Sequence, residues 1–543
     1  MFRFRSREVQ PDPPVAFASG LALACALLVA CASSGCLSPD WQLKPPEDLF
    51  QLARDKPGTE TKDKPETKDK PETKDKPETK DGQAKPEDGQ ADPEDEPTKP
   101  DEEEELPPGV KSDPGDEPAI PEDEVEEPEE EEEEAVEEAP AADPISEDPD
   151  DPGNAIEGIR KRHRERQSVL FPTTPTPIHD AVERSRDRLY QATSLRLGLA
   201  LTHLFQYTSE TPLSDDDNGN ATTLDLHASW DVLAQDEPTR GHVVARLQGR
   251  WDYGTTAPGT LATDSLGSLL GTANTFNPYS PAFLLRDLYW QQGSEEAGWA
   301  YRVGKITPDA LIGNSRHIGA GITFLPNAGV RPFSAAIADS GLGIAGTWFF
   351  NNRLKVTGMV SDANADRTDF GDIDEGDFFQ ALEVGYKVAP LTRDAGYSKL
   401  AVWHTSGTED GDSSNANLGP DGWGFFLKHE QELTRDGRAI GILRYGKSFE
   451  DAATYDQQAG ANLLFYEPAG PGRLANDLLG IGFNWVEPTQ VESHNEYNVE
   501  VFYRVPIVPL VDMTLSYQSV FNPSLAPDTD HASVFSIRFR TTF

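Results

Sequence analysis

The last residues of the chain, 531–543, alternate apolar and polar side chains in steps of two. Successive side chains of a strand point to opposite faces, so the pattern predicts a strand with one apolar and one polar face. Strands of transmembrane barrels have such faces, apolar toward lipid and polar toward the lumen. One half-buried strand of a soluble sandwich would look the same. The apolar face carries Phe535, Ile537, Phe539 and Phe543, and the polar face Ser536, Arg538, Arg540 and Thr542.

The same alternation recurs elsewhere, with His203 as an exception on one apolar face. A sandwich of this size would need continuous apolar runs for its central strands, so the repetition favours an all-β, antiparallel membrane barrel. The segments that repeat the pattern are 195–207, 224–232, 242–253, 497–505 and 511–518.

Short and long connections alternate between the expected strands, as they do in an antiparallel barrel with short periplasmic turns and longer external loops. The short ones are 235–239, 293–298, 351–353, 390–394, 435–437, 468–472 and 506–509. About eight long loops complete the count and predict about sixteen strands, with both barrel ends on the periplasmic side. The count also requires 309–338 to be one long third loop, although 319–324 and 330–336 have strand-like patterns.

The charge of the chain is concentrated ahead of this barrel. Residues 42–155 hold 43 acidic and 13 basic side chains, a net of −30 out of −46 for the whole sequence. A six-residue repeat that ends in proline begins at Glu60, and acidic blocks such as 129–134 follow it. The segment is therefore low in complexity. Such a segment cannot bury enough apolar area to fold, so we expect a disordered linker over 37–155. It acts as a solvated spacer or, alternatively, as a buffer of divalent ions.

Residues 1–36 have the form of an export signal, with a basic start and an apolar run from Val15 to Ala30. That run is shorter than a membrane-spanning helix normally needs. The residues that lead to Cys31 resemble a bacterial lipoprotein box, so Cys31 is the candidate for lipidation, and Cys36 fits less well. Cleavage near Ala32 is the alternative. The third cysteine, Cys25, also lies here, which excludes disulfides and thiolate metal sites from the later domain.

Between the linker and the barrel domain, which we place at 194–543, residues 156–193 are expected to form a periplasmic segment. It contains a basic run, 160–166, and a helical pattern from Ile178 to Tyr190. The basic run lacks the aromatic or groove-reading partners of a nucleic-acid site. We expect a short helix beneath the barrel, or a counter-charge for the acidic linker.

A barrel of about sixteen strands leaves a water-filled lumen, so passage of solutes is the expected function. The third loop is the natural constriction. Guanidinium groups suit hydroxyl and carboxylate recognition, so an Arg-rich eyelet would favour polyols or anions over cations. Each such residue is alternatively part of a solvated wall. The candidate eyelet residues are Arg246, Arg250, Arg286, Arg302, Lys305, Asp309, Arg316 and Arg331.

The strand 283–292 has no clear polar face, because Arg286 and Trp290 share one side and Asp287, Tyr289 and Gln291 the other. Trp290 is either a platform for a sugar ring or an aromatic residue at the periplasmic interface.

Four segments carry a resemblance to a known family: LLRDLYWQQ at 284–292, YRVGKITPD at 301–309, LSYQSVFNP at 515–523 and SIRFRTTF at 536–543. They resemble the carbohydrate-selective porins of the OprB type. The resemblance spans about 190–543 and implies a sixteen-stranded outer-membrane porin that takes up small sugars through an arginine-containing eyelet. The acidic linker and the lipidation candidate are departures from that family.

Other functions remain open from the sequence. The barrel could be a structural tether between envelope layers or a general porin without selectivity. An enzyme is not expected, because the histidines are scattered without an evident serine partner. The acidic loops 362–377 and 409–412 lack the regular ligand spacing of a calcium loop. We expect no metal, cofactor or nucleic acid, and as partners outer-membrane lipid, small sugars and further copies in a homotrimer.

Overall fold

The computed structural model describes a barrel and the segment that precedes it. The chain divides into two units, Met1–Val125 and Glu126–Phe543, and all described residues belong to the second. Predictions on the export signal, Cys31, the linker up to residue 142 and the loop 409–412 therefore lie outside the described residues. These residues are 143–164, 170–171, 177–233, 238–278, 282–365, 367–371, 373–388, 396–407, 420–470, 474, 477–489, 494–508 and 510–543.

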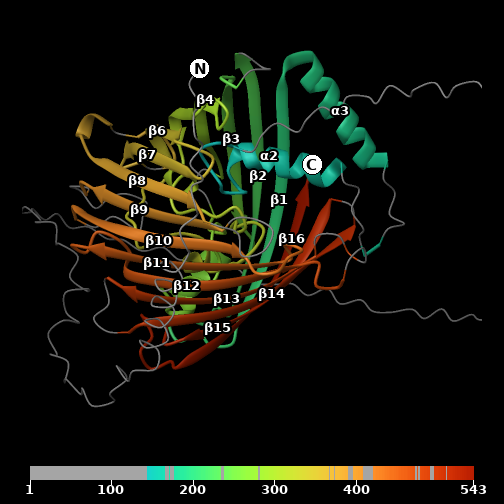
Figure 1. Cartoon of the computed structure of the whole chain (residues 1–543). Helices are drawn as coiled ribbons and strands as arrows, with labels where there is room; N and C mark the ends of the chain where they lie inside the picture. The colour runs from blue at the N-terminus through green and yellow to red at the C-terminus, as the bar shows by residue number, and fades with distance from the viewer. Residues whose placement is uncertain are drawn as a thin grey trace, which may run out of the picture. The chain divides into compact units, whose positions relative to one another are not determined.

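Sixteen antiparallel strands form one closed barrel in which each strand pairs with its sequence neighbours (Figure 1). This confirms the predicted fold class and strand count. The strands are β1 Leu195–Thr208, β2 Asn218–Leu233, β3 Gly241–Asp252, β4 Phe283–Ser294, β5 Trp299–Ile306, β6 Gly341–Phe349, β7 Leu354–Asp362, β8 Phe378–Lys387, β9 Tyr397–Thr405, β10 Gly422–Glu432, β11 Ala439–Phe449, β12 Tyr455–Tyr466, β13 Leu478–Pro488, β14 Glu496–Val508, β15 Val511–Phe521 and β16 His531–Thr542.

The barrel closes between its last and first strands. Strand β16 pairs with β1, with Ile537 opposite Phe205. Phe535 is 51% exposed on the outer face, whereas Arg538 is 1% exposed on the inner face. One face of β16 thus points outward and the other into the lumen.

The outer face is apolar around the whole wall. On neighbouring strands, Leu463 lies opposite Ile481, Ile481 opposite Val501, and Val501 opposite Tyr517. All four are exposed. A continuous apolar band on the outside with polar residues inside is the pattern of an outer-membrane barrel, the reverse of a water-soluble one. Among the described residues, no helix is long and apolar enough to cross a membrane.

A β-bulge explains the ambiguous polarity of β4. The pairing of β3 with β4 shifts between Arg246 and Leu247, and this leaves Arg286 as an extra residue on β4. Arg286 and its neighbour Asp287 are consequently both buried inside the barrel. A bulge of this kind reverses the alternation beyond it. Trp290 then faces outward near the short-turn end, where its Nε1 donates to the hydroxyl of Tyr301 at 3.2 Å.

Two long loops fold inward and fill much of the bore. The loop between β3 and β4 contains α4 (Pro258–Thr260) and the π-helix η2 (Leu261–Leu266), and Glu496 of β14 accepts hydrogen bonds from the backbone of Leu269 and Leu270. The third loop, 307–340, contains η3 (Pro308–Ala310) and α5 (Asn327–Val330) and no strand, as predicted. A further 3-10 turn, η4 (Ile373–Glu375), lies between β7 and β8.

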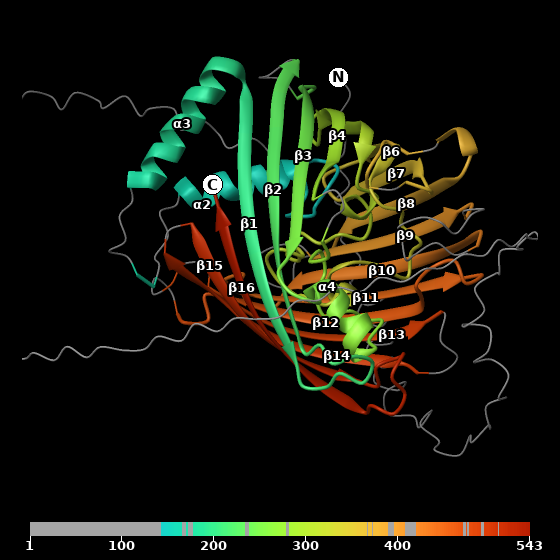
Figure 2. The same cartoon turned by 180° about the vertical axis from the view of Figure 1, so that it is seen from behind.

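Among the described residues, two helices precede the barrel, α2 (Pro152–Arg164) and α3 (Pro177–Thr193). Helix α3 confirms the helical pattern seen in the sequence and contacts β1. Helix α2 was not predicted, and it lies against β1, β2 and β3 (Figures 1 and 2). The predicted end of the linker at 155 is therefore too late, because residues 143–155 are ordered and largely buried within the barrel. Their apolar residues Ile145 and Ala155 are buried in the barrel, which the acidic composition of the segment does not indicate.

Candidate solute pathway through the barrel

The candidate eyelet residues of β3, β4 and β5 all lie on the inner wall. Each is buried, and they include Arg302, which is fully buried, and Lys305, at 2% exposure. Their strands are adjacent in the barrel. The structure thus places these five cations on one side of the lumen: Arg246, Arg250, Arg286, Arg302 and Lys305.

Several of these cations hold the wall to the third loop. The Nε of Arg246 lies 2.7 Å from Asp287 on the next strand, and its Nη2 donates to the hydroxyl of Thr307 at 3.1 Å. Arg286 forms an ion pair with Asp339 at the far end of the loop. Although burial alone would raise the pKa of Asp339, the nearby guanidinium groups lower it to about 2. The ion pair is therefore intact over the whole physiological pH range.

The candidates on the third loop do not join that cluster. Asp309 and Arg331 form an ion pair with each other. The guanidinium of Arg316 lies 3.6 Å from Glu430 on the inner face of β10, and its side chain is 47% exposed. The eight candidates therefore form no single ring: five line one wall, two pair within the loop, and Arg316 reaches another part of the wall.

Arg302 is held by a full set of partners, and its carboxylate partners come from ahead of the barrel. Its Nη1 lies 2.9 Å and its Nη2 3.3 Å from the two carboxylate oxygens of Asp151, while Nη2 also donates to Asp143 at 2.6 Å. Its Nε donates to Gln291 at 3.0 Å, and the guanidinium lies 4.0 Å from the ring centre of Tyr289. Every nitrogen of Arg302 is engaged.

A second ionic contact lies on the wall at β7 and β9. The two carboxylate oxygens of Glu147 lie 2.7 Å from Nζ of Lys355 and 2.8 Å from Nζ of Lys399. The ring centre of Tyr397, the first residue of β9, lies 5.7 Å from Nζ of Lys355 and 5.4 Å from Nζ of Lys399. These residues were not predicted, because Glu147 resembles the acidic linker and the lysines resemble ordinary wall positions.

The C-terminal part of the chain matches the model of a known protein family. Residues 384–543 match the carbohydrate-selective porin, OprB family. The matched range includes the motifs at 515–523 and 536–543, and the motifs at 284–292 and 301–309 lie outside it. None of the curated proteins compared with the sequence matches it.

A solved porin shares the fold. The high-pH structure of Pseudomonas putida OprB matches with a TM-score of 0.55 at 11% identity, over 69% of this chain and 99% of that one. The low-pH structure of the same protein matches over the same shares at 11% identity with a TM-score of 0.41. A mutant porin of Rhodopseudomonas blastica covers 64% of this chain and 100% of its own at 12% identity, with a TM-score of 0.38. At these identities the first match establishes the fold alone.

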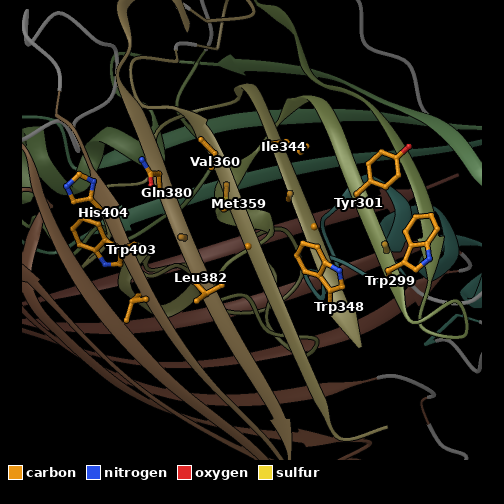
Figure 3. Close-up of a pocket in the computed structure, with 16 residues that line it drawn as sticks. Trp299, Tyr301, Ile344, Trp348, Met359, Val360, Gln380, Leu382, Trp403 and His404 are labelled. Atoms are coloured by element: carbon orange, nitrogen blue, oxygen red, sulfur yellow. The ribbon is translucent and has the colours of Figure 1, made fainter. Parts of the chain in front are cut away.

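A hollow of about 720 Å³ lies on β5 to β9, away from the candidate residues (Figure 3). Trp299, Tyr301 and Trp348 border it, and the missing side chains of Gly346 and Gly358 deepen it. Trp348 is 55% exposed on the outer wall. The hollow belongs to the outer surface of the barrel and is not part of a path through the lumen.

The third loop is fixed in the lumen by an arginine of the last strand. Arg538 donates to the carbonyl oxygens of Ala320 at 3.2 Å and Thr323 at 2.8 Å. We expect Arg538→Met to leave both carbonyls unpaired and to cost roughly 1–3 kcal/mol per buried group. In planar bilayers the current should fluctuate more, because the loop is less firmly held. Arg353→Met, on an exposed short turn, is the control, and a quiet Arg538→Met channel would contradict the anchoring role.

Proposed function

We propose that this protein is an outer-membrane porin through which small sugars diffuse passively. The single observation that carries the proposal is the closed sixteen-stranded barrel with an apolar outer band and a polar, cation-rich inner wall. The match of residues 384–543 to the carbohydrate-selective porin family supports sugars as the solute class. A lipid-facing band of this kind also supports residence in the outer membrane.

Within this proposal, the candidate eyelet residues have different roles. Arg246 and Arg286 hold the third loop, as the hydrogen bond of Arg246 to Thr307 and the ion pair of Arg286 with Asp339 indicate. Arg316 is the best placed to meet a solute, because it is 47% exposed and its acidic partner Glu430 is 3.6 Å away. A guanidinium with donors open to water suits the hydroxyl groups of a sugar.

The experiment is reconstitution of the full chain in planar bilayers with titration of glucose. We expect discrete conductance steps that glucose reduces, and Arg316→Gln should weaken that reduction several-fold because one donor pair is lost. Arg353→Gln, on the exposed turn between β6 and β7, is the matched control and should leave the block unchanged.

The outcomes separate the competing functions. Conductance that sugars do not reduce would replace the proposal by a general porin. No conductance in the wild-type chain, and none after neutralisation of the carboxylates of Asp143, Glu147 and Asp151, would favour a structural tether.

A further inference from the structure

The segment 143–164 crosses the lumen close to the short-turn end of the barrel. Its contacts fall near the strand ends that follow short turns: Arg302 in β5, Lys355 in β7 and Lys399 in β9. On the far side, Nη1 of Arg162 lies 2.9 Å from Asp512, the second residue of β15. One short segment therefore joins opposite parts of the wall.

The segment also seals against the third loop. The hydroxyl of Ser146 donates to the carbonyl of Ala310 at 2.5 Å, and the backbone amide of Gly321 donates to Asp150 at 2.9 Å. Ile145 is 1% exposed and belongs to the apolar core that the loop and the inner wall share. Segment and loop together occupy the bore where a solute would pass.

The conformation of the segment is built into its sequence. Asp151 precedes Pro152, an arrangement that favours a helix start, and its carbonyl accepts the first helical hydrogen bond from Ala155 at 2.8 Å. Asn154 then ties the preceding turn to the helix, because its side chain accepts from the amide of Asp143 and donates to Ser146 and Asp148. These local contacts help to fix the positions of the carboxylates of Asp143 and Asp151, which contact the wall.

Helix α2 anchors the segment on the inner wall. Ile156 and Ile159 are each 1% exposed. A side chain at Gly198 of β1 would lie 3.2 Å from Ile159 and 3.4 Å from Ile156, so the glycine permits the close approach of helix and strand. Burial of apolar residues on this wall stabilises the segment inside the barrel.

The segment supplies the counter-charges of several cations on the inner wall. Among the described residues, the carboxylate partners of Arg302, Lys355 and Arg540 all belong to the segment: Asp143 and Asp151, Glu147, and Asp150 at 3.6 Å. Without it, three cations of the lumen would lose their counter-charges. Buried charges without partners are costly, so this wall has a strong preference for carboxylates.

We propose that residues 143–164 form a built-in plug, and that the cationic wall it occupies binds carboxylate-bearing sugars such as uronates, which compete with the plug. This inference rests on the proposed porin function and extends its solute class from neutral sugars to anionic ones. The plug belongs to the same chain as the wall, so a solute competes with it at an effective concentration set by the connection between them.

The charge state of the plug supports the competition. Burial alone would raise the pKa of Glu147, but the ammonium groups of Lys399 and Lys355 hold that pKa well below its usual range. Glu147 is thus a carboxylate at neutral pH, as a uronate is. The two present the same group to the same lysines.

The test compares full-length variants in planar bilayers. The first combines Asp143→Asn, Glu147→Gln and Asp151→Asn and removes three charges from the plug. The matched control removes three charges from α3, outside the lumen contacts, by Asp180→Asn, Glu183→Gln and Asp187→Asn. We expect several-fold higher average conductance in the first variant, wild-type conductance in the control, and block of the opened channel by glucuronate at lower concentration than by glucose.

A second measurement does not depend on how the triple variant folds. Ser146 is 1% exposed, so the thiol in Ser146→Cys should react slowly with a membrane-impermeant maleimide. Mass spectrometry of the proteolytic peptide that contains position 146 measures the labelling. Glucuronate should accelerate the labelling, and glucose at the same concentration should not.

Each outcome separates the two proposals. Wild-type conductance equal to that of the neutralised variant, or rapid labelling at position 146 without solute, would overturn the plug. Equal block and equal labelling with glucuronate and glucose would overturn the carboxylate site. Absence of conductance in every variant would overturn the porin function itself.

Discussion

Arg302→Met should release residues 143–151 from the wall of the barrel while the strands stay folded. The change leaves the buried carboxylates of Asp143 and Asp151 without their guanidinium, and removal of one partner from a buried ion pair costs about 3–5 kcal/mol. Methionine keeps part of the packing on Tyr289. In hydrogen exchange, the amides of Ile145 and Ser146, which are bonded to Asp143, should exchange about 100-fold faster or more, since 1.4 kcal/mol corresponds to about tenfold.

Lys305→Met is the matched control, because Lys305 is a buried cation of the same strand. Its ammonium donates to the carbonyl of Arg367 at 3.3 Å, in the loop between β7 and β8, and not to the segment. Exchange at 145 and 146 should stay slow in this variant. Unchanged exchange in Arg302→Met would mean that the apolar contacts of Ile145 and α2 hold the segment without the ion pair.

The strands could be predicted because each carries its own evidence. Alternation in β16 or β1 is a local property, and the parity of short and long connections adds a constraint on the whole barrel. The third loop was assigned correctly by that parity, against the strand-like appearance of 319–324. The family motifs agree with this reading, although the matched range begins only at residue 384.

The arrangement inside the lumen could not be predicted from the same patterns. Whether Arg302 meets solvent, a sugar or Asp151 depends on contacts between residues far apart in the sequence, which periodicity does not record. The bulge at Arg286 removed the alternation that assigns a side, so this arginine could be placed only by pairing. The one local signal for the plug was the sequence from Asp151 to Asn154, an aspartate and proline at a helix start, inside a segment whose composition resembles the linker.

The last carboxylates of the acidic stretch 42–155 belong to the plug. Residues 42–155 carry 43 of the acidic side chains, and the carboxylates that contact the lumen are the last of them. Composition therefore does not reveal that the last carboxylates of this charged stretch meet arginine and lysine. Apolar neighbours such as Ile145 and Ile156 are buried with them in the barrel.

Ile481→Arg should destabilise the barrel in lipid by up to about 4 kcal/mol, because a cation on the lipid face costs about 2–4 kcal/mol at the bilayer midplane and less toward the interfaces. Ile481 is 38% exposed, and its neighbours across the strands, Leu463 and Val501, are equally apolar and outward. In a water-soluble barrel the same exposed substitution would change the free energy of unfolding by only about 0.5 kcal/mol. The measurement is urea unfolding of the full chain in phospholipid vesicles, followed by tryptophan fluorescence.

Two comparisons make the result specific to lipid contact. Ile481→Leu keeps an apolar side chain and should unfold at the wild-type urea concentration. Glu467→Arg, between β12 and β13 and beyond the strand ends, changes charge away from the apolar band. It breaks the partly exposed ion pair with Arg438, which contributes little to stability, and should have a small effect. If Ile481→Arg is as stable in vesicles as Ile481→Leu, then this face does not contact lipid, and the outer-membrane assignment of the barrel fails with it.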